Sequence, residues 1–146
     1  MLSSFVEPFT LVMIEDDEGH ALLIRKNLER SGIGNSLVHL KDGNAAIEYF
    51  FAQQNLLTNH EKSLILLDLN LPGIDGYEIL RRLKGDERTR KIPVIVLTTT
   101  DNPKEIDRCY ALGCNVYITK PVEYEGFSEA IRKLGLILAV VKIPHA

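Results

Sequence analysis

The chain of 146 residues contains no tryptophan and only two cysteines, Cys109 and Cys114. No second Cys or His pair stands at the spacing of a zinc site, so we expect two reduced thiols in a cytosolic core. An excess of one charge is also missing, since 17 Lys and Arg residues stand against 20 Asp and Glu residues, for a net charge of −3. This balance excludes the basic footprint that is typical of nucleic-acid-binding proteins.

Long apolar runs are absent as well. No stretch reaches the length of about 18 apolar residues that a membrane span needs, and the N-terminus lacks the basic and apolar regions of a signal peptide. The composition, with 45% hydrophobic and 25% charged residues, is typical of a globular protein. We therefore expect one cytoplasmic domain that spans residues 1–146 without a membrane segment.

Short apolar runs alternate with amphipathic segments along the chain. Strands are expected at about 9–15, 36–40, 64–68, 92–98 and 115–118. Helices are expected at about 18–31, 44–53, 76–84, 102–113 and 124–140, with a polar loop at 54–62. This alternation predicts an α/β fold, a doubly wound parallel sheet of five strands covered by helices on both faces.

Polar side chains stand at the carboxyl ends of four expected strands. These side chains are Glu15, Asp16, Asp17, Asp68, Thr98 and Lys120. Open α/β sheets bind their ligands at this edge, so we expect the side chains to meet there. Together they can hold a divalent cation and a phosphoryl group.

The carboxylates have two interpretations. Residues 15–17 alone fit an acidic helix start, stabilised by the helix dipole, as well as they fit a metal site. Asp68 favours the metal site, because several carboxylates in one cleft repel each other unless a cation lies among them. Oxygen-rich sites of this kind suit Mg²⁺.

Asp68 is a candidate nucleophile, since an Asp carboxylate can form an aspartyl-phosphate. Lys120 could neutralise the phosphoryl oxygens, although a solvated surface lysine is the alternative. Pro121 favours a fixed turn, with a cis Lys120–Pro121 peptide that aims the lysine inward. Thr98 could donate to the phosphoryl group and let the Tyr117 ring move inward. The alternative for Thr98 is a β-prone strand end, and the alternative for Tyr117 is a half-buried core aromatic.

Glu15-Asp16, Asp68 with its Leu-Asn-Leu-Pro-Gly sequel, Thr98, Tyr117 and Lys120-Pro121 resemble the receiver domain of two-component response regulators. The resemblance spans nearly the whole chain. It implies a flavodoxin-like (CheY-like) sheet of strand order 2-1-3-4-5 with five helices. It also implies that the chain accepts a phosphoryl group from the phosphohistidine of a sensor histidine kinase.

The resemblance implies a role for each matching residue. Asp68 would be the phospho-acceptor. The metal, Mg²⁺ or Mn²⁺, would be held by Asp16, Asp68 and the Asn70 backbone carbonyl, with Glu15 acting through a water. The phosphoryl-binding and switch residues would be Thr98, Thr99, Tyr117 and Lys120, while Asn70 and Thr100 would affect the phosphoryl lifetime.

A narrower resemblance points to single-domain regulators paired with bacterial phytochromes. It is carried by the polar insert before residue 64, the segments 66–73 and 92–100, and the ending Val141-Lys142-Ile143-Pro144. It implies that the partner kinase is a bacteriophytochrome, a red/far-red photoreceptor.

The last expected helix, with its tail at about 124–146, is followed by no second domain, so we expect no output domain and no direct DNA binding. Its apolar residues include Ile137, Val140, Val141 and Ile143. Such a patch predicts a homodimer through the helix at 102–113, the strand at 115–118 and this helix. The alternative is that the helix folds back on its own domain.

Three other functions compete with the signalling switch. An aspartyl-phosphate phosphatase needs a second carboxylate two residues after the nucleophile, where this chain has Asn70. A nucleotide-binding protein of flavodoxin type needs a glycine-rich loop after the first strand, where residues 15–17 are acidic. A module that never carries phosphate would not need the acidic pair Glu15-Asp16, nor Asp68, nor Lys120. We therefore expect a phospho-acceptor that catalyses only its own phosphorylation and dephosphorylation, not an enzyme with a separate substrate.

Overall fold

A computed structural model describes residues 10–31, 36–52, 63–120 and 125. They form a five-stranded sheet of order β2-β1-β3-β4-β5, in which each neighbouring pair is parallel. The strands are β1 Thr10–Ile14, β2 Ser36–Leu40, β3 Ser63–Asp68, β4 Val94–Thr98 and β5 Val116–Thr119. The doubly wound architecture and strand order expected from the sequence are confirmed.

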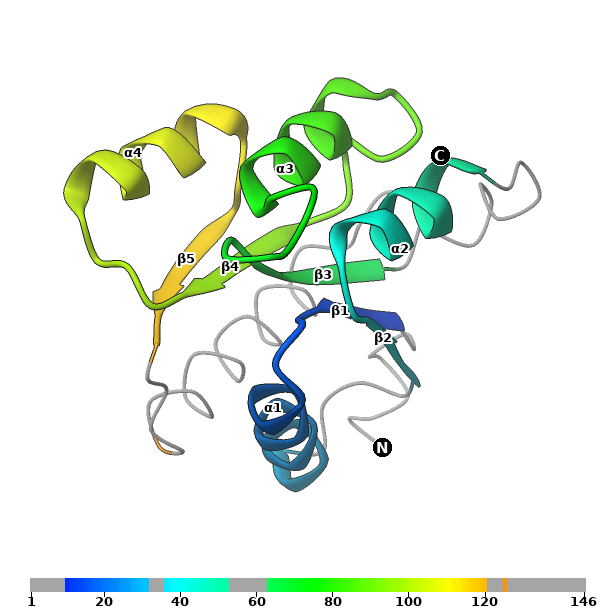
Figure 1. Cartoon of the computed structure of the whole chain (residues 1–146), viewed down its shortest axis with the longest axis vertical. Coiled ribbons are helices and arrows are strands. Elements are labelled where there is room, and N and C mark those ends of the chain that lie inside the picture. Colours follow the sequence, from blue (N-terminus) through cyan, green and yellow to red (C-terminus); the bar gives the residue numbers. More distant parts are fainter. Residues whose placement is uncertain (1–9, 32–35, 53–62, 121–124, 126–146) are drawn as a thin grey trace, which may run out of the picture.

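Helices cover both faces of the sheet. They are α1 Glu18–Ser31, α2 Gly43–Ile47 with the π-helical turn η2 Glu48–Ala52, α3 Gly76–Gly85 and α4 Pro103–Leu112. Figure 1 shows α2, α3 and α4 on one face and α1 on the other. None of these helices has the length and apolar character needed to cross a bilayer. The expected helix at 124–140 lies outside the described residues, except for Glu125.

The strand sequences explain this two-sided packing. Alternate residues of a strand point to opposite faces of the sheet. Val12, Ile14, Ile65 and Leu67 join the core under α2, α3 and α4. Leu11, Met13, Leu64 and Leu66 join the core under α1. All residues of β3 and β4 are buried, which explains why their sequences are almost continuously apolar.

The single helix expected at 44–53 is divided in the structure. The Asp42 side chain accepts a hydrogen bond from the Ala45 N–H at 2.7 Å and caps α2. After Ile47 the backbone widens into η2. Phe50 is fully buried there, and its ring meets Tyr49 edge to face at 5.0 Å. Residue 53, the expected helix end, lies outside the described residues.

Two strands begin later than the apolar pattern predicts. β4 begins at Val94 rather than residue 92, because Pro93 has no N–H and the Ile92 N–H donates to the Thr89 carbonyl at 3.0 Å. β5 begins at Val116 rather than residue 115, and ends at Thr119. The Asn115 N–H donates to the Val94 carbonyl at 2.8 Å, and the Asn115 side-chain oxygen accepts from the Val94 N–H at 2.8 Å, so its side chain supplies an acceptor that a backbone carbonyl would otherwise provide.

Candidate functional site

The carboxyl ends of the strands bring buried polar side chains to one edge of the sheet. Glu15 follows β1, Asp68 ends β3, Thr98 ends β4 and Lys120 follows β5. Their exposed fractions are only 1%, 7%, 0% and 7%, respectively. Polar groups this deeply buried need partners to offset their lost hydration, so their contacts define the site.

Three carboxylates converge at this edge. Oxygen atoms of Glu15, Asp16 and Asp68 lie within 4.8 Å of one another, with Asp16 exposed and the other two buried. Burial raises the pKa of Glu15 to about 7; the neighbouring Asp68 carboxylate adds to the rise and Lys120 opposes it. A set of hard oxygen ligands that repel one another fits a divalent cation.

Lys120 supplies the positive charge of the site. Its Nζ donates to Glu15 Oε1 in a short ion pair and lies 3.7 Å from Asp68 Oδ2. Its backbone N–H donates to the Thr98 carbonyl at 2.6 Å, which fixes the residue beside β4. Lys120 is therefore directed inward, and the alternative of a solvated surface lysine is wrong. The expected cis peptide involves Pro121, which lies outside the described residues.

The turn after β3 holds Asp68 in place. The Asn70 N–H donates to Asp68 Oδ1 at 3.2 Å. The Asn70 side-chain amide reaches across to Thr98 Oγ1 at 3.5 Å and Thr99 Oγ1 at 3.3 Å. Gly76, the first residue of α3, presses on the same turn, because a Cβ there would lie 2.6 Å from the Asp68 carbonyl oxygen. The turn thus links the end of β3 to both β4 and α3.

Tyr117 lies on β5 opposite Val96, two residues before Thr98 on the neighbouring strand. Its ring is half-buried against the core. Its hydroxyl donates to the Thr100 carbonyl at 2.6 Å, which ties β5 to the segment before α4. Burial raises the Tyr117 pKa to about 12, so the hydroxyl remains a donor at neutral pH. This bond connects the carboxyl-end edge of the sheet to the α4–β5 face.

Two histidines that the sequence did not single out also lie at this site. His20 Nδ1 lies 3.3 Å from Lys120 Nζ and 3.9 Å from Glu15 Oε1. His39 Nε2 lies 2.7 Å from the Glu15 carbonyl oxygen. The signal for His20 was its position three residues after Asp17, which places it over the acidic turn on the first turn of α1.

The comparison with known families agrees with this geometry. A family model described as "Response regulator receiver domain" matches residues 11–132. The chain therefore belongs to the response regulator receiver domain family, and the resemblance expected from its sequence is confirmed.

Relatives of several kinds support the assignment. A receiver-domain crystal structure from Rhodospirillum rubrum is 50% identical, with a TM-score of 0.80, and the match covers 94% of this chain and 98% of that one. The response regulator Rcp1 of Synechocystis is 37% identical over 95% of both chains. The Mn²⁺-bound form of Rcp1 has also been solved, with a TM-score of 0.72, 31% identity, and coverage of 95% of this chain and 97% of that one. The phosphorylated cyanobacterial phytochrome response regulator RcpA has a TM-score of 0.77 and is 30% identical, covering 92% of this chain and 96% of its own.

Proposed function

We propose that this chain is a response regulator that accepts a phosphoryl group onto Asp68 from the phosphohistidine of a sensor histidine kinase. One observation carries the proposal. The buried Asp68 carboxylate belongs to an acidic cluster that fits a divalent cation, and the Lys120 ammonium lies 3.7 Å from it. An aspartate flanked by two positions for positive charge is suited to take up a dianionic phosphoryl group.

The transfer would proceed by in-line displacement. An Asp68 carboxylate oxygen attacks phosphorus, the P–N bond of the phosphohistidine breaks, and the donor imidazole leaves with the bonding electron pair. Little covalent chemistry is left to the protein, so catalysis consists mainly of positioning and charge neutralisation. The Asn70 N–H orients the Asp68 carboxylate, Lys120 neutralises a phosphoryl oxygen, and the Thr98 hydroxyl donates to another.

The proposed cofactor is Mg²⁺, with Mn²⁺ as a substitute. Asp16, Asp68 and the Asn70 backbone carbonyl would hold the ion, and Glu15 would act through a water molecule. When bound, the ion supplies positive charge that screens the phosphoryl oxygens from the three carboxylates. Support comes from the oxygen donor set of this chain and from the Mn²⁺-bound relative Rcp1.

Thr98, Thr99 and Tyr117 are proposed to read the phosphorylation state. The Asn70 amide contacts the hydroxyls of Thr98 and Thr99, and Tyr117 binds the Thr100 carbonyl. A new phosphoryl group would compete for the Thr98 hydroxyl and so disturb this network. The sequence placed a carboxamide, Asn70, where an aspartyl-phosphate phosphatase needs a carboxylate, which favours a signalling role over enzymatic turnover of another substrate.

The proposed kinase partner is a bacteriophytochrome. The relatives support this pairing, since RcpA is a phytochrome response regulator and another matched structure, 34% identical, is a bacteriophytochrome response regulator. We therefore place the chain in the cytoplasm, where such kinases would reach it. A phosphotransfer assay with a purified bacteriophytochrome, under red and far-red light, tests the pairing. Transfer that is independent of the light quality would contradict it.

We further propose that the chain is a single receiver domain that acts through its own surface, without direct DNA binding. It would form a homodimer through α4, β5 and the expected helix that carries Ile137, Val140, Val141 and Ile143, which lie outside the described residues. Light scattering should then give twice the 16.4 kDa chain mass. A monomeric mass that stays constant up to tens of micromolar, roughly the range of weak dimers, would contradict the dimer.

Intact mass spectrometry tests the acceptor chemistry. The protein is incubated with acetyl phosphate, with Mg²⁺ or with a chelator in its place. We expect a gain of one phosphoryl mass that requires Mg²⁺ and is absent in Asp68→Asn. Asp107→Asn, a change at an exposed acidic residue of α4, is the matched control and should be labelled like the wild type. No gain in the wild-type protein, with Mg²⁺ binding confirmed, would favour a module that acts without phosphate.

A further inference from the structure

A strongly basic segment interrupts this acidic chain. Residues 81–91 contain six of the 17 Lys and Arg residues, whereas the whole chain has a net charge of −3. The six are Arg81, Arg82, Lys84, Arg88, Arg90 and Lys91. Five of them are exposed, and Lys84 is half-buried. The segment therefore forms a basic surface where α3 ends and the chain turns toward β4.

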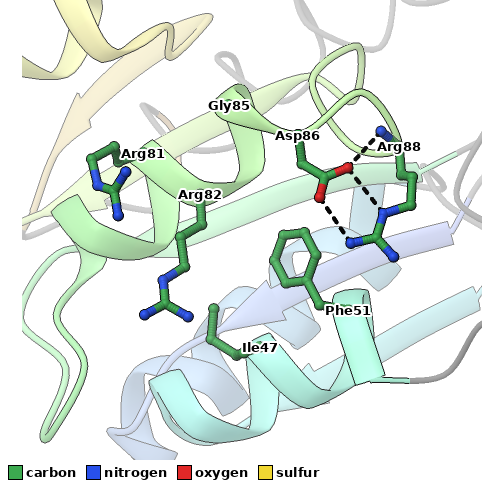
Figure 2. A pocket seen from close by; sticks show the side chains of 7 residues that line it. All are labelled: Ile47, Phe51, Arg81, Arg82, Gly85, Asp86 and Arg88. Carbon is green, nitrogen blue, oxygen red and sulfur yellow. Dashed lines mark hydrogen bonds and ion pairs between the residues drawn. The ribbon is translucent and has the colours of Figure 1, made fainter.

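A groove of roughly 310 Å³ lies beside this segment, between η2 and α3 (Figure 2). We call it the arginine groove; its principal lining residues are Ile47, Phe51, Arg81, Arg82, Asp86 and Arg88. Its volume is near the lower end for binding pockets, which run from about 300 to 1,000 Å³. The lining combines an apolar floor with guanidinium groups above it.

Acidic neighbours hold the guanidinium groups in place. Asp86 accepts from Arg88 Nε at 3.0 Å and Nη2 at 2.8 Å. Glu78 accepts from Arg82 Nε at 2.8 Å and also binds Arg81. Figure 2 shows the guanidinium groups of Arg82 and Arg88 on either side of the Phe51 ring, with the terminal nitrogens of Arg82 directed toward Ile47. Two oriented guanidinium groups thus flank an apolar floor, and their nitrogens other than those bound to Asp86 and Glu78 can donate to a further carboxylate.

The position of Arg88 over Phe51 favours an acidic peptide over a nucleic acid as the ligand of the groove. The guanidinium carbon of Arg88 lies 5.4 Å from the centroid of the Phe51 ring, and the ring packs against the core cluster. Arg88 therefore occupies the ring face on which a nucleic-acid base would stack. Carboxylates can still bind the arginines, and an apolar side chain can contact Ile47 and the ring edge.

We propose that the arginine groove docks an acidic peptide segment of a partner protein, with carboxylates on Arg82 and Arg88 and an apolar side chain against Ile47 and Phe51. The charge of the groove is complementary to such a segment, and preorganised arginines lower the entropy lost on binding.

The arginine groove is separate from the carboxyl-end edge of the sheet, which holds Asp68. α3 begins at Gly76, against the turn that follows Asp68, and ends at Gly85, beside the groove. Its ten residues span about 15 Å at the helical rise of about 1.5 Å per residue. Peptide binding by the unphosphorylated protein is thus expected whether or not Asp68 accepts a phosphoryl group.

Fluorescence anisotropy tests the proposal with a defined probe. The probe is a fluorescein-labelled decapeptide of glutamate and aspartate around a central Leu-Phe pair, titrated with the full chain. We expect saturable binding that Arg82→Ala and Arg88→Ala each weaken by at least about fivefold, the effect of losing a charged hydrogen bond. Arg25→Ala removes the same charge from an exposed site on α1, across the sheet, and should weaken binding by less than about twofold. A probe with Ser-Ser in place of Leu-Phe should bind at least about fivefold more weakly.

Several results would overturn the proposal. One is no binding of the decapeptide by the wild-type chain; another is equal weakening by Arg25→Ala and Arg82→Ala, which would indicate an effect of net charge alone. Binding of a labelled single-stranded DNA in preference to the peptide would point to nucleic acid instead. A change in the light-scattering mass on substitution of Arg82 and Arg88 would identify the occupant as a second copy of the chain. Thermal unfolding of each variant confirms that it is folded.

Discussion

At the scale of single residues, buried charge is concentrated at one edge of the sheet. Among the described residues, the charged side chains that are buried are Glu15, Asp68 and Lys120. Asp16 adds a third, exposed carboxylate to the cluster. One ammonium group cannot neutralise three carboxylates, so the folded state should be stabilised by a bound divalent cation.

The first prediction concerns this cation. At about 100 times its dissociation constant, Mg²⁺ should raise the free energy of unfolding by about 2.7 kcal/mol, because it binds the folded state preferentially. Asp16→Asn should remove most of this gain, since it deletes an exposed ligand without disturbing the core. Glu29→Gln, at an exposed acidic site farther along α1, serves as the control. Thermal unfolding with and without Mg²⁺ measures the effect; equal stabilisation of both variants would contradict the assigned metal site.

The second prediction concerns the two thiols. Burial raises the pKa values of Cys109 and Cys114 to about 11. At pH 8 only about a thousandth of each thiol is therefore ionised, and only the thiolate reacts. Iodoacetamide should leave both unmodified in the folded protein and label both in urea. Mass spectrometry measures the labelling, and equally fast labelling in the two states would contradict the burial.

The same thiols have a consequence for stability. A pKa that is higher in the folded state favours folding below the unfolded-state value and loses this contribution as the pH rises through the folded-state value. The stability of the wild-type protein should thus fall between about pH 9 and pH 11, and less steeply in Cys109→Ala. Urea denaturation across this range checks the sign.

The acidic residues, Asp68 and Lys120 were predictable from the sequence, because each lies at or just after the end of an apolar strand. His20 was missed because the contact with Lys120 joins residues 100 positions apart. Linear spacing shows which residues share a helix turn, but not which side chain from another strand lies opposite. His39 was missed for the same reason, since its contact crosses from β2 to the end of β1.

At the scale of elements, α3 runs from the turn after Asp68 to the arginine groove. Its two terminal glycines, Gly76 and Gly85, have different surroundings. Gly76→Ala would place a Cβ 2.5 Å from Leu69 Cα and 2.6 Å from the Asp68 carbonyl oxygen. Backbone atoms cannot yield easily, so we predict a loss of about 1–3 kcal/mol in the free energy of unfolding and slower phosphorylation of Asp68.

The control for this third prediction lies in the same helix. A Cβ at Gly85 would meet nothing within 4 Å, so Gly85→Ala should leave phosphorylation unchanged and stabilise α3 by up to about 1 kcal/mol. Urea unfolding measures both variants. A Gly76→Ala protein as stable as the wild type would show that the turn after β3 is not held by this contact.

The strands β1, β3 and β4 were the most predictable, because strands buried on both faces must be almost wholly apolar. The ends of the strands were less predictable, because side chains decided them: Pro93 could not donate to the sheet, and the Asn115 side chain replaced a backbone acceptor. The π-helical turn was also missed, since Tyr49-Phe50-Phe51 has no pattern that distinguishes it from a regular helix.

At the scale of the whole molecule, two surfaces lie apart: the proposed phospho-acceptor site at the carboxyl ends of the strands and the arginine groove near the end of α3. The fourth prediction is that phosphorylation draws Thr98 toward the new group and changes the burial of Tyr117, so that its bond to the Thr100 carbonyl is altered. Such a shift requires only that the phosphoryl group favours one of two states.

NMR of the methyl groups and aromatic rings checks this switch. The resonances of Thr98 and Tyr117 should shift between the free and phosphorylated protein. Thr89, which is fully buried and bonded to the Leu83 carbonyl at 2.7 Å, belongs to the α3–β4 connection and should shift little. Unchanged Thr98 and Tyr117 resonances in fully phosphorylated protein would contradict the switch.

The central claim, that Asp68 is the acceptor, is tested most directly by locating the modified residue. Borohydride reduces an aspartyl-phosphate to homoserine, so peptide mapping by mass spectrometry after phosphorylation and reduction identifies the site. We predict homoserine at position 68 and at no other aspartate. Homoserine at Asp16 or Asp17 instead, or at no position in a protein shown to have gained a phosphoryl group, would contradict it.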